Sequence, residues 1–91
     1  MYKIKPTLKF QKDLKKLQKR GYNISLLTDV IRKLAEGETL PDRYRDHMLV
    51  GEFRGCRECH IASDWLLIYE IDGETLYLYL TRTGTHSDLF R

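Results

Sequence analysis

The sequence predicts an α+β fold, with an N-terminal strand, a helical hairpin and then an antiparallel β-meander packed on the helices. Apolar residues recur at the helical period of 3.6 up to about residue 37, and after about residue 47 the period changes to 2. Tight turn signals between the later segments indicate antiparallel neighbours. The helical hairpin must then cover one face of the sheet, and the opposite face, which carries tyrosines and polar groups, is free to bind a partner.

The first part of the chain is predicted to form one strand and two helices. Residues 2–5 alternate in polarity and can form a short strand. Thr7 is a suitable N-cap for a helix that runs to about Arg20, and Asn23 can cap a second helix that ends near Gly37. The apolar stripes of the two helices are Phe10, Leu14 and Leu17, followed by Ile24, Leu27, Val30, Ile31 and Leu34.

After a polar loop over residues 38–46, the sequence predicts four strands. They are Met48–Phe53, Cys56–Ile61, Trp65–Ile71 and Thr75–Thr83. The third is apolar on both faces, as expected for a central strand, and Asp72-Gly73 is a hairpin turn signal. In the last strand Leu76, Leu78 and Leu80 share one face, and a short tail follows Gly84.

The length and composition predict one cytoplasmic domain spanning residues 1–91. No apolar run approaches the roughly 18 residues of a transmembrane helix, and the N-terminus lacks the apolar segment of a secretory signal. Cys56 and Cys59 form a C-x-x-C on a predicted strand, where their side chains face opposite sides. We therefore interpret them as buried apolar side chains, since neither a redox helix nor a second zinc half-site is present.

Positive charge is concentrated in the first 20 residues, which hold seven lysines and one arginine against one aspartate, a net charge of +7. The rest of the chain sums to −4, because the total is +3. A basic segment of this kind suits a polyanion such as nucleic acid or an acidic protein, although a solvated helix face is an equally simple reading.

All three histidines lie in the second half of the chain within polar segments. Direction counting along the meander puts His47, His60, Asp64, Arg82 and His86 toward one edge of the sheet. Histidine titrates near neutrality, so this set predicts acid–base cleavage of a phosphodiester. A zinc site is the weaker alternative, because the histidine spacings match no compact motif. Trp65 is expected to be at least partly in the core, whereas Phe90 is the better candidate for stacking on a base.

Three segments resemble the RelE/ParE superfamily of toxins from toxin–antitoxin modules, and specifically its YafQ branch. The matching pieces are Tyr44-x-Asp46-His47-x-Leu49-x-Gly51, Arg57-x-x-His60-x-x-x-Asp64-Trp65-Leu66-Leu67-Ile68-Tyr69 and Arg82-Thr83-Gly84-Thr85-His86-x-x-Leu89-Phe90. The resemblance implies an mRNA interferase toxin of a type II module, which cuts messenger RNA in the ribosomal A site without a cofactor. It also implies a cognate antitoxin as partner.

Carried over residue by residue, the resemblance places function at His47, His60, Asp64, Trp65, Arg82, His86 and Phe90. We expect His86 to act as general acid, His47 or Asp64 as general base, His60 to orient or stabilise, and Arg82 to hold the scissile phosphate. Lys9, Lys12, Lys15 and Lys16 would dock on ribosomal RNA through phosphate contacts. The alternatives are a binding-only module that inhibits a target, as in the ParE branch, and a metal-dependent nuclease.

Overall fold

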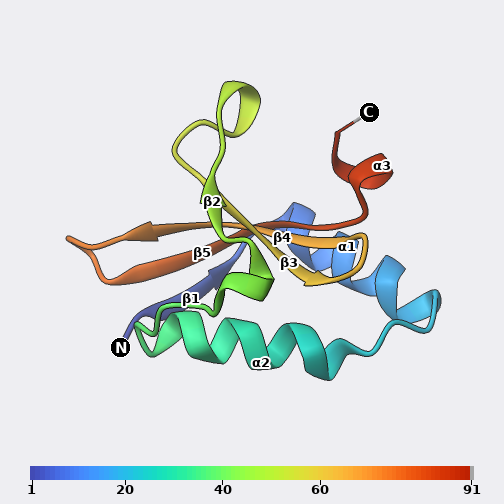
Figure 1. The fold of residues 1–91 in the computed structure, drawn as a ribbon, viewed down its shortest axis with the longest axis horizontal. Helices are drawn as coiled ribbons and strands as arrows, with labels where there is room; N and C mark the ends of the chain where they lie inside the picture. The colour runs from blue at the N-terminus through green and yellow to red at the C-terminus, as the bar shows by residue number, and fades with distance from the viewer. Residues whose placement is uncertain (91) are drawn as a thin grey trace.

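The computed structural model describes residues 1–90 and has the predicted α+β architecture (Figure 1). The elements in chain order are β1 (Lys3–Pro6), α1 (Leu8–Lys19), α2 (Ile24–Ala35), η1 (Asp42–Tyr44), β2 (His47–Met48), η2 (Gly51–Phe53), β3 (Arg57–Ala62), β4 (Trp65–Asp72), β5 (Tyr77–Gly84) and α3 (His86–Leu89). The strands form one sheet in the order β1-β5-β4-β3-β2. The antiparallel meander from β2 to β5 is confirmed, and β1 joins its edge parallel to β5, so the sheet is mixed.

Both long helices begin where their capping residues predict. The Thr7 hydroxyl accepts a hydrogen bond from the Phe10 amide, and the Asn23 side chain accepts one from the Ser25 amide. The two helices lie on the same side of the sheet, as Figure 1 shows for α2 below the strands. No helix within residues 1–90 is long and apolar enough to span a membrane.

The main core lies between these helices and one face of the sheet. Its buried members include Phe10 and Leu17 from α1, Leu27, Val30 and Leu34 from α2, and Cys59, Leu67, Tyr69, Leu78 and Leu80 from the strands. Burial of this much apolar surface is the dominant favourable term for a domain of this size.

A second, smaller cluster covers part of the opposite face. It consists of Cys56, Leu66, Ile68 and Leu89, with Leu49 and Phe53 packed against it. Figure 1 shows the segment that carries η2 and the short helix α3 standing on this side of the sheet, away from α2. The opposite face is therefore only partly open, because the η2 segment and α3 occupy the end near the carboxyl terminus of β5.

Two segments differ from the sequence prediction. The strand predicted over Met48–Phe53 is wrong, because β2 contains only two residues and the chain then turns through η2. Gly51 adopts a φ of 72°, a left-handed conformation that ends the extended run. Leu76 does not share the buried face of β5, since it occupies the β4–β5 turn with φ 60° and is 52% exposed. The tail after Gly84 forms α3, which the sequence pattern did not predict.

Cys56 and Cys59 are both buried free thiols, and they belong to different apolar clusters on opposite faces of the sheet. Their interpretation as buried apolar side chains is confirmed. Burial raises the pKa of the Cys59 thiol to about 12 and also raises the pKa of Cys56. Since the thiolate is the reactive form, both cysteines should be inert in the folded protein.

We expect neither cysteine to react with a thiol reagent until the protein unfolds, since the thiolate population is small and access is blocked. Time courses with an aromatic disulfide reagent, in buffer and in denaturant, measure this directly. A Cys56→Ala variant reports Cys59 alone. Rapid labelling of Cys59 in buffer, or an intramolecular disulfide after mild oxidation, would contradict the packing described above.

Candidate active site

The sheet register places the predicted site residues on two adjacent rungs of one face. Along the first rung, His47 lies opposite Glu58, Glu58 opposite Ile68, and Ile68 opposite Arg82. The next rung carries His60, Leu66 and Gly84. Directly opposed residues of antiparallel strands project to the same face, so these side chains lie on the side that α3 partly covers.

The helix α3 holds His86 through a capping box. The Thr85 hydroxyl accepts a hydrogen bond from the Asp88 amide at 3.1 Å, and the Thr85 amide donates to Asp88 Oδ2 at 3.0 Å. Gly84, at φ 156°, approaches Asp88 so closely that an added Cβ would lie 3.0 Å from its side chain. A four-residue helix is not stable alone, so these contacts define where His86 sits.

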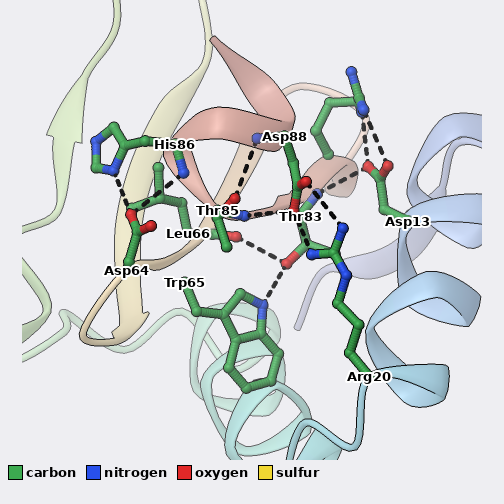
Figure 2. A network of polar contacts seen from close by, with 10 residues as sticks. Asp13, Arg20, Asp64, Trp65, Leu66, Thr83, Thr85, His86 and Asp88 are labelled. Carbon is green, nitrogen blue, oxygen red and sulfur yellow. Dashed lines mark hydrogen bonds and ion pairs between the residues drawn. The ribbon is translucent and has the colours of Figure 1, made fainter. Parts of the chain in front are cut away.

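Asp88 also ties α3 to the end of α1. Arg20 donates two hydrogen bonds to the Asp88 carboxylate, at 2.8 and 3.1 Å. This bidentate geometry is the stronger form of an arginine–carboxylate pair. Hydrogen bonding from Arg20 holds the pKa of Asp88 well below its ordinary value of 3.8. Figure 2 shows Arg20 and Thr85 converging on Asp88 from different elements.

His86 is oriented by Asp64, which lies in the β3–β4 turn. Asp64 Oδ1 is 2.7 Å from His86 Nδ1 and 3.3 Å from the His86 backbone nitrogen. A carboxylate can only accept, so Nδ1 carries the hydrogen and Nε2 is left for chemistry. Hydrogen bonds from His86 hold the pKa of Asp64 below its ordinary value. Both side chains are more than half exposed, so solvent and substrate can reach the pair.

His60 and Phe90 flank His86. The ring centroid of His60 lies 6.1 Å from that of His86, and the centroid of Phe90 lies 6.0 Å from it. Phe90 also makes an edge contact with Phe53 at 5.7 Å and remains 43% exposed. Within residues 1–90, the His60 ring makes ring contacts but no hydrogen bond through either nitrogen. Its ring nitrogens are therefore available to a bound molecule.

His47 has both ring nitrogens engaged. Nδ1 donates to the Arg45 carbonyl oxygen at 2.7 Å, and Nε2 lies 3.0 Å from Glu58 Oε2. Glu58 is 5% exposed, and its other oxygen, Oε1, is buried and has no hydrogen-bond partner among residues 1–90. His47 and Glu58 thus lie within ion-pair distance and form one unit beside His60.

Trp65 does not present a face for stacking, which corrects its predicted role as an RNA-binding residue. It is 3% exposed, and Tyr22 packs edge-on against it at 5.1 Å. The indole N–H donates to the Thr83 hydroxyl at 2.9 Å, and that hydroxyl donates to the Leu66 carbonyl oxygen at 2.8 Å (Figure 2). Trp65 instead fixes β4 against β5 directly beneath the turn that carries Asp64.

Arg82 is held by a buried carboxylate. Its Nε and Nη2 donate to Asp13 at 2.7 and 3.0 Å, and Asp13 also accepts from the Thr83 amide at 3.1 Å. These hydrogen bonds raise the pKa of Arg82. Arg82 lines a groove of about 420 Å³ together with Lys9 and Phe53. Asp13 does not engage Nη1, so the guanidinium retains donors toward this groove.

The comparisons with known proteins identify the family. The family model for the YafQ bacterial toxin of type II toxin–antitoxin systems matches residues 2–91. The chain belongs to the YafQ toxin family. It is 38% identical over 82 residues to the mRNA interferase toxin YafQ of Escherichia coli K12, covering 89% of this chain and 87% of the relative.

Solved structures agree with this assignment. YafQ from Escherichia coli BL21(DE3) superposes with a TM-score of 0.93 at 34% identity over the full length of both chains. A metal-bound toxin from Helicobacter pylori gives 0.92 at 43% identity, over 99% of this chain and 100% of the other. YafQ in the Escherichia coli DinJ–YafQ complex gives 0.91 at 35% identity over both full chains.

The structure adds four residues to the site that the sequence reasoning on the YafQ-like motifs missed. Asp13 holds Arg82, Glu58 lies against His47, and Arg20 pairs with Asp88, which caps α3. Glu58 carried a usable signal, because its spacing of two from His60 on one strand puts both on the same face. Asp13 and Arg20 carried none, since their partners lie 69 and 68 residues away.

The Arg20–Asp88 pair predicts a specific dependence of stability on acid. The folded-state pKa of Asp88 is depressed, so its contribution is complete above the ordinary value of 3.8 and is lost as pH falls through the folded-state pKa. We expect Asp88→Asn to lower the thermal midpoint at pH 7 by about 4–8 °C, the effect of roughly 1 kcal/mol in a domain of this size. As the pH falls below about 4, the stability of Asp88→Asn should also decrease less than that of the wild type.

Asp29→Asn is the matched control, because Asp29 also pairs with basic side chains but on an exposed surface of α2. It should shift the midpoint little, since exposed pairs contribute at most about 1 kcal/mol and usually less. Equal shifts for the two variants, measured by circular dichroism from pH 2 to 8, would show that the Asp88 pair does not anchor α3.

Proposed function

We propose that this chain is an mRNA interferase, an endoribonuclease that cleaves messenger RNA on the ribosome by acid–base catalysis. Two observations support this proposal: membership of the YafQ family, and the pair of histidine rings 6.1 Å apart, one free and one oriented by a carboxylate. The mRNA interferase activity is named for the Escherichia coli relative. A binding-only toxin would have no use for such a pair.

The reaction requires two proton transfers. The 2′-OH of one nucleotide attacks the adjacent phosphorus, a base takes its proton, and the bond from phosphorus to the 5′ oxygen breaks as an acid protonates that oxygen. We assign His86 as the acid, because the Asp64 carboxylate at its Nδ1 would stabilise the imidazolium form, whose Nε2–H would then donate the proton. The product ends are then a 2′,3′-cyclic phosphate and a 5′-hydroxyl.

His60 is the base that the geometry favours, in place of His47 or Asp64. Asp64 is committed to His86, and both nitrogens of His47 are engaged, whereas His60 has no hydrogen-bond partner within residues 1–90. The centroids of the two rings lie 6.1 Å apart, so both rings could contact one phosphate. The His47–Glu58 unit would then act by orienting the RNA and the adjoining strand.

Arg82 and Phe90 complete the arrangement. The free edge of the Arg82 guanidinium, already fixed by Asp13, would stabilise negative charge on the phosphate without reorganisation during the reaction. The exposed ring of Phe90, braced by Phe53, would stack on a base next to the scissile bond. Trp65 would act only by supporting the strand pair beneath Asp64.

We extend the proposal to two partners. Because YafQ of Escherichia coli is seen in complex with DinJ, we expect a cognate antitoxin to bind this chain as well. The lysines of α1 are exposed, and Lys9 borders the Arg82 groove, so α1 would contact ribosomal RNA through phosphates near the site. A cytoplasmic location follows from a ribosomal target.

The Helicobacter pylori toxin that is metal-bound raises a second mode of catalysis. Within residues 1–90, no group of three or more His, Cys, Asp or Glu side chains lies close enough together to hold a metal ion. Product analysis separates the two chemistries, because metal-assisted hydrolysis leaves a 3′-hydroxyl and 2′-OH attack leaves a cyclic phosphate.

The roles of His86 and His60 can be separated with RNA in which sulfur replaces the 5′ leaving oxygen. A thiolate leaves without protonation, so His86→Ala should lose about 10²–10⁴-fold on natural RNA and regain most of this with the sulfur substrate. His60→Ala should lose a similar factor and remain slow on both. Single-turnover cleavage on programmed ribosomes is the measurement.

His47→Gln serves as the control, because it should reduce the cleavage rate by the same factor on both substrates. Rescue of His60→Ala by sulfur would reverse the two roles. Absence of cleavage by the wild type on either substrate would overturn the proposed function itself.

The role of α1 predicts a salt-dependent loss of ribosome association. Reversing Lys9, Lys12 and Lys16 to Glu should weaken ribosome association by at least tenfold and flatten its dependence on salt, because fewer counterions are released. The same reversal at Lys3, Lys5 and Arg32 changes the net charge equally at residues that do not line the Arg82 groove. Equal losses for both triple variants in sedimentation assays would mean that net charge alone matters.

A further inference from the structure

A cationic cavity lies beside His60 on the side away from His86. Its volume is about 350 Å³, and it is lined by Arg43, Arg45, His60, Ala62 and Ser63. Neither His86 nor Phe90 lines it, so it is distinct from the space between the two histidine rings. None of its lining residues is acidic.

The backbone explains why these residues meet. The β2–β3 pairing ends at His47, which lies opposite Glu58, two residues before His60 on β3. The preceding segment is η1, which holds Arg43, ends at the left-handed Arg45 and lies against β3. Both arginines therefore reach the same cavity as His60, the histidine proposed as the base.

Local contacts hold both arginines at the cavity. Arg43 donates a hydrogen bond to the Tyr44 hydroxyl at 3.0 Å, and its guanidinium stacks on the buried Tyr44 ring at 4.9 Å. Arg45 has a left-handed backbone with φ 49°, and its carbonyl accepts from His47. A bulky residue rarely adopts this conformation, so the His47 contact and the turn of η1 impose it.

Two carboxylates of the neighbouring segments are engaged with other side chains. Asp46 is bonded to Arg57 and to the Tyr69 hydroxyl, which belongs to the main core on the helix side of the sheet. Glu58 is bonded to His47. Within residues 1–90, the guanidinium of Arg45 has no hydrogen bond or ion pair. Two uncompensated guanidinium groups at a polar cavity are suited to bind phosphate oxygens.

We propose that Arg43 and Arg45 form a second phosphate subsite, which binds the phosphate on the 5′ side of the attacking nucleotide. This inference rests on the proposed function. The base takes the 2′ proton from the nucleotide whose 3′ phosphate is cleaved, so that nucleotide lies on the His60 side. Its own 5′ phosphate then falls into the cavity beyond His60, where Ser63 offers a further hydroxyl donor.

The subsite has a functional consequence. Binding a flanking phosphate positions the attacking ribose relative to His60, and positioning of this kind raises the rate of the chemical step. It carries no base preference, because phosphate contacts set register and orientation only. Sequence preference would then arise elsewhere, for instance at Phe90.

The test combines arginine variants with a neutral methylphosphonate at one flanking phosphate. Wild-type kcat/KM on programmed ribosomes should fall about tenfold, which corresponds to ~1.4 kcal/mol, when the 5′-flanking phosphate is neutral. The Arg43→Gln/Arg45→Gln variant should cleave natural RNA as slowly as the wild type cleaves RNA with the neutral 5′-flanking linkage. The neutral linkage should not slow this variant further, since the two changes remove the same interaction.

Three controls make the result decisive. A methylphosphonate on the 3′ side should slow the wild type and the double variant by the same factor. Arg32→Gln, which removes one charge on α2, should respond to the 5′ change as the wild type does. The single variant Arg45→Gln keeps the Arg43–Tyr44 contact, so a loss of activity in it cannot come from loss of that contact. Thermal unfolding shows whether each variant is folded.

Independent, multiplicative losses from the arginine changes and the 5′ methylphosphonate would overturn the subsite. Preserved activity of Arg43→Gln/Arg45→Gln on natural RNA would do the same. In either case the wild type still cleaves, so the proposed function stands. If the wild type cleaves no RNA, the proposed function fails first, and the subsite with it.

Discussion

The Asp88 carboxylate is the point on which the arrangement of the site depends. It joins the C-terminal end of α1, through Arg20, to the capping box of α3, through Thr85. The short helix α3 cannot persist by itself, yet it carries His86 and leads into Phe90. One carboxylate therefore links the stability of the domain to the position of the group proposed as the acid.

The layer beneath the site is held by a small buried polar network. The indole of Trp65, the hydroxyl of Thr83 and the carbonyl of Leu66 are linked in series, and Asp13 receives both Arg82 and the Thr83 amide. Every member that is buried here has a partner, and satisfied networks of this kind favour a unique arrangement. The sheet thus presents His60, Arg82 and the Asp64 turn on a rigid surface.

The charges of the protein are arranged in two ways. The lysines of α1 are exposed and unpaired with acids of their own helix, which suits long-range attraction of a polyanion. Arg20, Arg57 and Arg82 are instead bonded to carboxylates and serve as anchors. Arg43 and Arg45 belong to neither group, since they lie at a cavity beside His60 and pair with no carboxylate in the part of the chain that the structure describes.

The sequence alone determined the element order, the helix caps, the burial of both cysteines and the gathering of the histidines at one end of the sheet. These follow from local periodicity, capping chemistry and strand direction, which neighbouring residues decide. It did not determine that Met48–Phe53 would turn at Gly51, that α3 would form, or that Trp65 would be buried. Those outcomes depend on contacts with distant segments, such as Arg20 with Asp88 and Trp65 with Thr83. The roles proposed for His47, His60 and Asp64 also rest on the tertiary structure, because their contacts differ in ways that the sequence does not show.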